Sequence, residues 1–158
     1  MARLSVNGLQ ELLDQFTIIN ALPESVAKDM LNAGADVVVK AQREEIARQW
    51  TGPYSIGISA KSVKKGRVKW ALDGGHIIFV SPQGTRKRGK SKVSNAEIAF
   101  LNEYGVSGAG RGRGHKRRTA TKRTLPRPAM RAANEKSVEK VLAVESRVYH
   151  NFLDSINL

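Results

Sequence analysis

The sequence has no cysteine among its 158 residues. Disulfide bonds, thiolate catalysis and cysteine-ligated zinc sites are therefore excluded. Its apolar runs fall far short of the roughly 20 residues that cross a bilayer, and the opening segment "MARLSVNGLQELLDQF" holds no apolar core of a secretory signal. From these absences we expect a soluble protein that is made in the cytoplasm and has no contact with a membrane.

Side chains that commonly do chemistry are also scarce. Three histidines are present, and no two of them stand at the spacing of metal ligands: His76, His115 and His150. Between residues 50 and 131 only three carboxylates occur. Asp73 belongs to a predicted turn and Glu97 to a predicted helix cap, so Glu103 is the one without a local structural role. We therefore expect no catalytic residue, no enzymatic activity, no cofactor and no metal site.

Positive charge is abundant and concentrated. The net charge is +13, and residues 50–131 hold nineteen basic residues against three acidic ones, whereas both ends of the chain are close to neutral. A charge that served solubility alone would be spread more evenly, so this distribution indicates an acidic or polyanionic partner. A solvated surface is the plainer alternative. The densest part is a polar loop over about residues 106–124, which carries these cations: Arg111, Arg113, Lys116, Arg117, Arg118, Lys122 and Arg123.

The loop resembles two kinds of binding segment only superficially. The glycines of "GVSGAGRGRG" lack the preceding strand and following helix of a dinucleotide site, and the Gly-Lys-Ser/Thr ending of a P-loop is missing. Its Arg-Gly steps would attract nucleic-acid phosphates in a salt-dependent way. However, no Phe, Tyr or Trp occurs between residues 105 and 148 to stack on bases. Any nucleic-acid contact would therefore involve the backbone, without sequence specificity.

Apolar residues at spacings of three and four predict four helices. The first covers 6–19, and the second covers 23–49, from Pro23 to a stop at Trp50. A short helix lies between Ser94, which has a capping-box partner in Glu97, and a left-handed stop at Gly105. The last runs from about Pro128 almost to the end. The apolar residues that repeat along the second helix are Val26, Met30, Ala33, Val37, Ala41 and, less regularly, Ile46. Those that line one side of the last helix are Met130, Ala133, Val138, Val141, Leu142, Val148, Tyr149, Phe152 and Ile156.

The middle of the chain changes to the period of strands. "RVKWAL" alternates apolar and polar residues, "DGG" at 73–75 predicts a hairpin turn, and "HIIFV" at 76–80 returns as the second strand, ended by "SPQG". "YSIGIS" at 54–59 is a third strand or an extended lead-in. Runs of one element type followed by the other indicate an α+β fold. We expect a single domain over 1–158, with a small antiparallel sheet packed against the two long helices and the basic loop before the C-terminal helix.

Two segments on either side of the basic loop are similar to a known family. They are "AEIAFLNEYG" at 96–105 and "TLPRPAMRAANEK" at 124–136. Together they resemble the neck or tail-completion family of long-tailed bacteriophages, over about residues 20–155. "WTGPYSIGISAKSVK" at 50–64 resembles a further family segment imperfectly, and an aromatic residue that often precedes the last helix is missing here. The positions that match the family pattern are Ala99, Glu103, Gly105, Pro126, Arg127, Pro128, Met130 and Ala133.

This resemblance implies a structural virion protein without catalysis or cofactor. Members of the family form a homo-oligomeric connector ring, here expected to be a hexamer, in the neck between the head-closure proteins and the tail tube. The implied partners are other copies of the chain, head-closure proteins, tail-terminator or tail-tube proteins, and genomic DNA in the lumen of the ring. The basic loop would then contact an acidic surface or the DNA backbone.

The sequence also predicts one ion pair and allows one alternative function. Pro126 and Pro128 impose an extended backbone around Arg127 before the last helix, and we expect the Arg127 guanidinium to form an ion pair with Glu103. The alternative function is that of a basic nucleic-acid-associated protein that binds DNA or RNA backbone without sequence specificity.

Overall fold

The structure, a computed structural model, describes residues 22–51, 58–71, 75–88, 91–105 and 125–156. Long helices and small antiparallel two-stranded ladders confirm the predicted α+β class. The predicted helix over 6–19 and the basic loop over 106–124, with its seven cations, lie outside the described residues.

The long helix α2 (Glu24–Gln49) starts one residue later than predicted and ends as predicted. Pro23 precedes it with φ −56°, an angle that the proline ring imposes and that suits the start of a helix. Glu24 in the first turn and Arg48 in the last turn complement the helix dipole. Trp50 follows as the C-cap residue and is buried.

The strands form three separate antiparallel ladders rather than one sheet. Strand β1 (Val63–Lys65) pairs with β4 (Val80–Pro82), with Val63 opposite Pro82. Strand β2 (Lys69–Trp70) pairs with β3 (His76–Ile77) across the predicted turn, with Trp70 opposite His76. Strand β5 (Thr85–Arg88) pairs with β6 (Ser91–Ser94).

Two shorter helices and one long helix complete the order. Helix α3 (Ile58–Ser62) precedes β1, and α4 (Asn95–Tyr104) follows β6. The Ser94 Oγ accepts the Glu97 N–H at 3.0 Å, which confirms the predicted cap of α4. Helix α5 (Ala129–Ser155) begins directly after Pro128 and runs almost to the end of the chain, as predicted.

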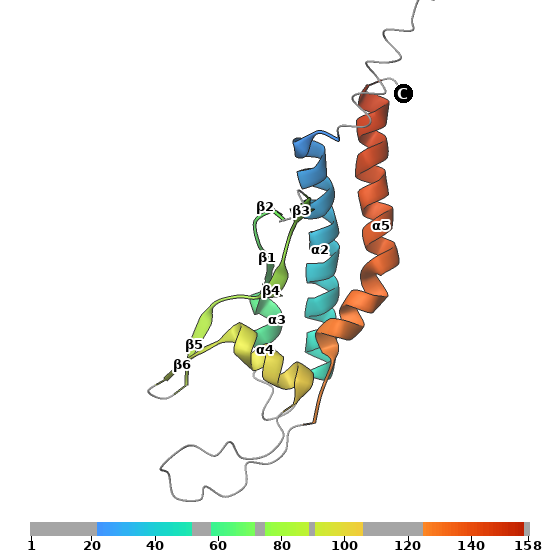
Figure 1. Ribbon diagram of the computed structural model, residues 1–158. Helices are drawn as coiled ribbons and strands as arrows, with labels where there is room; N and C mark the ends of the chain where they lie inside the picture. Colours follow the sequence, from blue (N-terminus) through green and yellow to red (C-terminus); the bar gives the residue numbers. More distant parts are fainter. Residues whose placement is uncertain (1–21, 52–57, 72–74, 89–90, 106–124, 157–158) are drawn as a thin grey trace, which may run out of the picture.

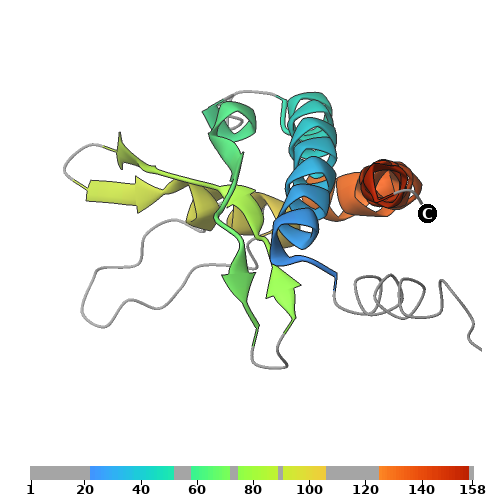
Figure 2. The ribbon, with the colours of Figure 1, turned by 90° about the horizontal axis from the view of Figure 1, so that it is seen from above.

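Helix α2 lies at the centre of the molecule. It runs beside α5, and strands β1–β4 lie on its other side (Figures 1 and 2). Helix α4 and the β5–β6 ladder extend from the end of the molecule where α2 ends and α5 begins (Figure 1). The main apolar core sits at this same end and consists of Val39, Ile46, Trp50, Val63, Ala99 and Ala129. Burial of each large apolar side chain in it stabilises the fold by about 1.5–3 kcal/mol.

Three local predictions were wrong. Residues 58–59 of the expected third strand belong to α3, while 54–57 lie outside the described residues. The single strand expected over 76–80 is divided into β3 and β4, and β4 ends at Pro82, within "SPQG", rather than before it. The ladder β5–β6 was not predicted, because "TRKRGKSKVS" carries charges in place of an apolar alternation.

The burial of the long helices also differs from the predicted stripes. In α2 the buried apolar side chains are Ala35, Val39 and Ile46. Ile46 was among the predicted residues, but all three lie on the face opposite Val26, Met30, Ala33, Val37 and Ala41. Both faces of α2 are apolar, so periodicity did not identify the one against the core. In α5 Ala133 is buried as predicted, together with Ala129 and Ser137, whereas the predicted Val138 and Leu142 are exposed.

Candidate functional site

The residues of the two family-like segments meet where α4 ends and α5 begins. Glu103, in the last turn of α4, is buried, and its carboxylate faces the first turn of α5. The Met130 N–H donates to Glu103 Oε2 at 3.0 Å, and the Arg131 N–H donates to Glu103 Oε1 at 2.9 Å. Glu103 therefore caps α5 with both carboxylate oxygens.

The local sequence of α5 explains why this cap comes from another helix. The first amide groups of a helix have no partner within the helix. Pro128 holds the N-cap position and makes no side-chain cap, since its ring carries no acceptor. A carboxylate satisfies two of these amides and also places a negative charge at the positive end of the helix dipole. Glu103 thus supplies from α4 what the proline cannot supply.

Arg127 is held by contacts of its backbone and its side chain. Its N–H donates to the Asn102 carbonyl at 2.8 Å, and its own carbonyl accepts the Trp50 Nε1–H at 3.0 Å. Its Nη1 donates to the Thr51 carbonyl at 3.2 Å. The segment before α5 is therefore tied both to α4 and to the end of α2.

The predicted ion pair between Glu103 and Arg127 is wrong. Among the described residues, the salt bridges do not include this pair. The Glu103 oxygens accept hydrogen bonds from two amides of α5, whereas the guanidinium of Arg127 donates to the Thr51 carbonyl. Backbone amides of a helix start compete successfully with an arginine because they are already aligned with the carboxylate.

Small side chains let the helices of this junction approach closely. Ala99 of α4 is 2% exposed, and Ala129 and Ala133 of α5 are 0% and 1% exposed. A larger side chain at any of these alanines would push the helices apart. The family-like positions therefore have structural roles around one junction: Ala99, Ala133, Glu103, Gly105, Pro126, Arg127 and Pro128.

Gly105 forms the exit from this junction toward the basic loop. It follows α4 with φ 73° and ψ 179°. The positive φ confirms the predicted glycine stop, although the ψ is extended rather than helical. The described residues that flank 106–124 are Gly105, at the end of α4, and Leu125, two residues before Arg127. The cations of the loop lie outside the described residues, so the structure places their attachment points and not their side chains.

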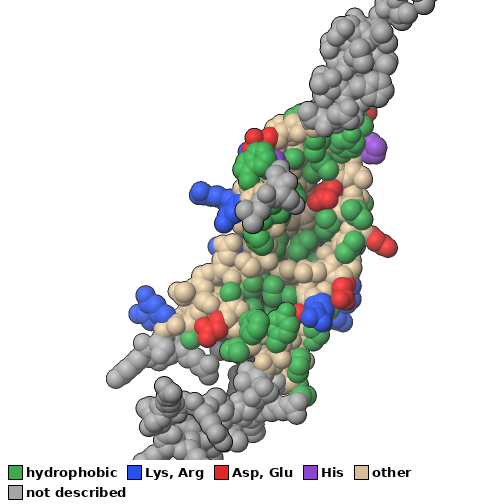
Figure 3. Space-filling view, viewed as in Figure 1, with side chains coloured by type: hydrophobic (Ala, Val, Ile, Leu, Met, Phe, Trp, Pro, Cys, Tyr) green, Lys and Arg blue, Asp and Glu red, His purple; other side chains and the backbone are tan. Residues whose placement is uncertain are grey.

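Further basic residues lie on the described ladder next to the junction. Lys87 and Lys92 of β5–β6 are exposed, and Arg86 is half-buried. Figure 3 shows basic side chains at this end of the molecule, on the same face as apolar side chains of α4. The rings of Phe100 and Tyr104 lie 4.7 Å apart between centroids and are mostly exposed. The surface at this end is therefore both basic and partly aromatic.

Glu45 joins the two long helices near the junction. Its carboxylate accepts hydrogen bonds from Arg48, from Gln49 Nε2 at 2.9 Å and from Lys136 Nζ of α5 at 3.1 Å. These bonds, with that of Arg48 the strongest cause, lower the pKa of Glu45 from its ordinary 4.5 to about 2. The Gln42 Nε2 donates to Asn134 Oδ1 at 2.8 Å beside it. Apolar periodicity does not predict this polar contact between α2 and α5, because these residues interrupt it.

The described residues offer no metal or membrane site. In the ranges that the structure covers, no three His, Asp or Glu side chains gather closely enough to hold a metal ion. His76 packs beside Trp70, with ring centroids 4.1 Å apart, and His150 is exposed on α5. Within the same ranges, no helix is long and apolar enough to cross a membrane.

Comparison with known proteins adds no relative. No model of a known protein family matches the chain, and neither the curated proteins nor the solved structures contain a match to it.

Proposed function

We propose that this protein is a structural component of the neck of a long-tailed bacteriophage, where copies of the chain form a connector ring that helps to join heads to tails. The observation that carries the proposal is the bidentate cap of α5 by Glu103. It gives a common purpose to two short segments that are separated by the basic loop and that resemble the neck or tail-completion family.

The geometry supports an assembly role because the residues of the junction hold the segments that flank the basic loop and do not form a reaction site. Glu103, Gly105, Pro126, Arg127 and Pro128 hold the two ends of a loop that is rich in arginine and lysine. The side chains of Glu103 and Arg127 contact only backbone groups among the described hydrogen bonds, and the Arg127 carbonyl accepts the indole N–H of Trp50. A rigid base that presents a long cationic loop suits contact with a large acidic partner.

The charge of the loop fits two partners in a neck. Its seven cations require counter-charges, and acidic residues are scarce in this part of the sequence. DNA phosphates in the lumen of a ring, or carboxylates of an adjacent ring, would supply them. Arginine suits either partner, because its planar guanidinium can donate two parallel hydrogen bonds to a phosphate or a carboxylate.

The test replaces the seven loop cations with Ser in the phage that encodes this chain: Arg111, Arg113, Lys116, Arg117, Arg118, Lys122 and Arg123. We expect the variant protein to fold normally, because the substitutions avoid the described core. We expect infectious yield to fall and unjoined heads and tails, or heads that have lost DNA, to accumulate. Electron microscopy and plaque counts measure these outcomes.

A matched control removes the same charge elsewhere. It replaces seven exposed cations of the described part with Ser: Lys40, Lys61, Lys64, Arg67, Lys69, Lys140 and Arg147. We expect this control to assemble more particles than the loop variant. Normal particle yield from the loop variant would overturn the assigned role of the loop.

The ring itself is tested by stoichiometry. Quantitative mass spectrometry of purified virions should find several copies of the chain per particle, six for the proposed hexamer, since heterologous contacts that close generate rings. Absence of the chain from virions, or a single copy per particle, would refute the connector role. A monomeric protein outside virions that binds DNA or RNA would instead favour the nucleic-acid-associated function.

A further inference from the structure

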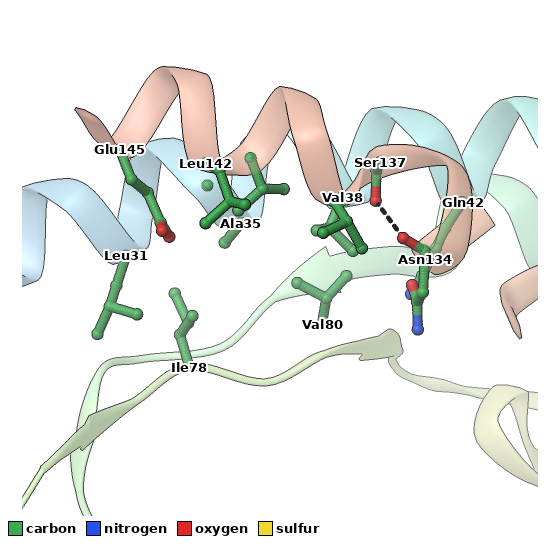
Figure 4. Close-up of a pocket in the computed structure, with 13 residues that line it drawn as sticks. Leu31, Ala35, Val38, Gln42, Ile78, Val80, Asn134, Ser137, Leu142 and Glu145 are labelled. Carbon is green, nitrogen blue, oxygen red and sulfur yellow. Dashed lines mark hydrogen bonds between the residues drawn. The ribbon is translucent and has the colours of Figure 1, made fainter. Parts of the chain in front are cut away.

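An open apolar groove runs along α2, between α5 and the segment that contains β3 and β4. It encloses about 390 Å³. Figure 2 shows α2 at the corner between α5 and the β2–β3 hairpin, and Figure 4 shows side chains of all three elements turned toward the groove. Its apolar lining includes Leu31, Ala35, Val38, Ile78, Val80 and Leu142.

The α5 wall of the groove is uncovered. Val138 is 51% exposed and Leu142 is 59% exposed, although their spacing in the sequence predicts a buried stripe. Glu145 lines the groove and lies against Gly34, where an added Cβ would come within 2.5 Å of its Oε1. Partial burial raises the pKa of Glu145. The groove thus leaves apolar side chains exposed to water, and contiguous exposed apolar surface of this kind marks a binding site.

The chain contains a segment with the properties of that element. Residues 6–19 carry one apolar stripe: Leu9, Leu12, Leu13, Phe16 and Ile19. Polar residues such as Gln10, Glu11 and Asp14 lie away from it. As a helix these fourteen residues would be about 21 Å long, and the groove face of α2 from Leu31 to Gln42 is about 16 Å long at 1.5 Å per residue.

The point of attachment favours this segment of the same chain. It joins α2 through residues 20–22 and Pro23, at the end of α2 nearest to Leu31 (Figure 1). A connection of this length is typical of two antiparallel helices. A short tether also gives the segment a high effective concentration at its own groove. We propose that residues 6–19 form an amphipathic helix that occupies the groove of its own chain, antiparallel to α2. This inference is independent of the connector function.

The absence of cysteine allows a direct test of the full-length protein by thiol labelling. Leu142→Cys places a thiol on the exposed wall of the groove, and Lys140→Cys places one on an exposed site of α5 away from it. If the segment covers the groove, the thiol at 142 should react about tenfold more slowly than the thiol at 140, which corresponds to about 1.4 kcal/mol of closing free energy.

Two changes should abolish the protection. Leu12→Asp combined with Phe16→Asp places charge on the apolar stripe, and deletion of residues 1–21 removes the segment altogether. In both backgrounds the thiol at 142 should react nearly as fast as the thiol at 140. The control Gln10→Asp adds a charge to the polar face and should leave the protection unchanged. Circular dichroism of each variant verifies that α2 and α5 remain folded.

Three outcomes would overturn the proposal. Equal labelling rates at 142 and 140 in the otherwise unaltered chain would show that the groove is open. Protection that survives the deletion would show that another element covers it. Protection that disappears on dilution, together with a loss of oligomers in native mass spectrometry, would assign the groove to the segment of a neighbouring copy.

Discussion

Among single residues, two buried carboxylates, Glu103 and Glu45, connect the helices at and near the junction through hydrogen bonds. The Glu103 carboxylate accepts hydrogen bonds from two backbone amides instead of pairing with a cation. The Glu45 carboxylate accepts hydrogen bonds from side chains of both α2 and α5. Loss of Glu103 leaves two backbone amides at the start of α5 without their acceptor, whereas the Arg48 and Lys136 side chains that bind Glu45 are largely exposed to water. Stability measurements on single substitutions therefore report directly on the junction.

Glu103→Ala should lower the free energy of unfolding by about 1–2 kcal/mol, which is the usual cost of removing a helix cap. The physical reason is that the Met130 and Arg131 amides lose their acceptor. Urea denaturation measures the change. The control is Glu139→Ala at an exposed site of α5, which should change stability by less than about 0.5 kcal/mol. An equal effect of the two substitutions would contradict the role assigned to the cap.

Glu45 predicts a dependence of stability on pH. Its pKa is lowered from 4.5 to about 2 in the folded protein, so the folded state binds fewer protons than the unfolded state in this range. The stabilisation is complete above about pH 4.5 and is lost as the pH falls toward 2. Glu45→Gln should therefore be less stable than the unaltered protein at neutral pH, and the difference should shrink in acid.

Thermal denaturation across this pH range provides the measurement for Glu45. Glu44→Gln removes the same charge from an exposed neighbour in α2 and serves as the control. If the stability difference between Glu45→Gln and the unaltered protein stays constant from neutral pH to pH 2, the hydrogen bonds to Glu45 do not stabilise the charged carboxylate.

At the scale of elements, the end of α4 and the start of α5 are joined by residues that restrict the backbone. Gly105 has a positive φ and an extended ψ, a combination that is accessible almost only to glycine. Pro126 and Pro128 limit the backbone on the returning side of the loop. These constraints fix the directions in which the basic loop leaves and rejoins the junction.

Gly105→Ala should lower the free energy of unfolding by about 1–3 kcal/mol, because an alanine in this backbone region is strained. Denaturation by urea tests this prediction. Tyr104→Ala, at the exposed neighbouring position, changes the side chain without demanding a positive φ and is the matched control. Unchanged stability of Gly105→Ala would mean that the chain leaves α4 by another backbone path.

At the scale of the whole molecule, the charge is divided along the sequence. The chain has a net charge of +13, and its excess of basic residues lies in residues 50–131, which include the β5–β6 ladder and the basic loop. In the structure the ladder and both loop ends lie at the end of the molecule that also holds the core (Figure 1). The described part of this end carries exposed basic residues, among them Lys87 and Lys92 of the ladder.

Any binding of the purified protein to duplex DNA should be independent of base sequence, since the basic loop lacks aromatic residues and lies between helices that present no base-reading motif. Two duplexes of unrelated sequence should give equal dissociation constants, and the affinity should fall steeply with salt. Substitution of the seven loop cations with Ser should flatten that salt dependence more than the matched control does. A marked preference for one duplex would contradict contact by charge alone.

The three described long and medium helices and the location of the charge could be predicted from local sequence patterns. Local rules were sufficient for α2, α4 and α5, because Pro23, the Ser94 cap, Gly105 and Pro128 act within a few residues of the helix ends. The same rules placed the basic loop between two anchored segments. They also predicted the α+β class from the change of period between residues 50 and 80.

The tertiary structure decided the partners of those elements. Both faces of α2 are apolar, and only its position between α5 and the strands selects Ala35, Val39 and Ile46 for the core. Glu103 could have paired with Arg127 or capped a helix, and the choice depends on where the amides of Met130 and Arg131 lie in space. The ladder β5–β6 carries no apolar alternation, so backbone pairing alone defines it. Spacing along a chain encodes local geometry, whereas competition among distant donors and faces is settled only when the elements pack.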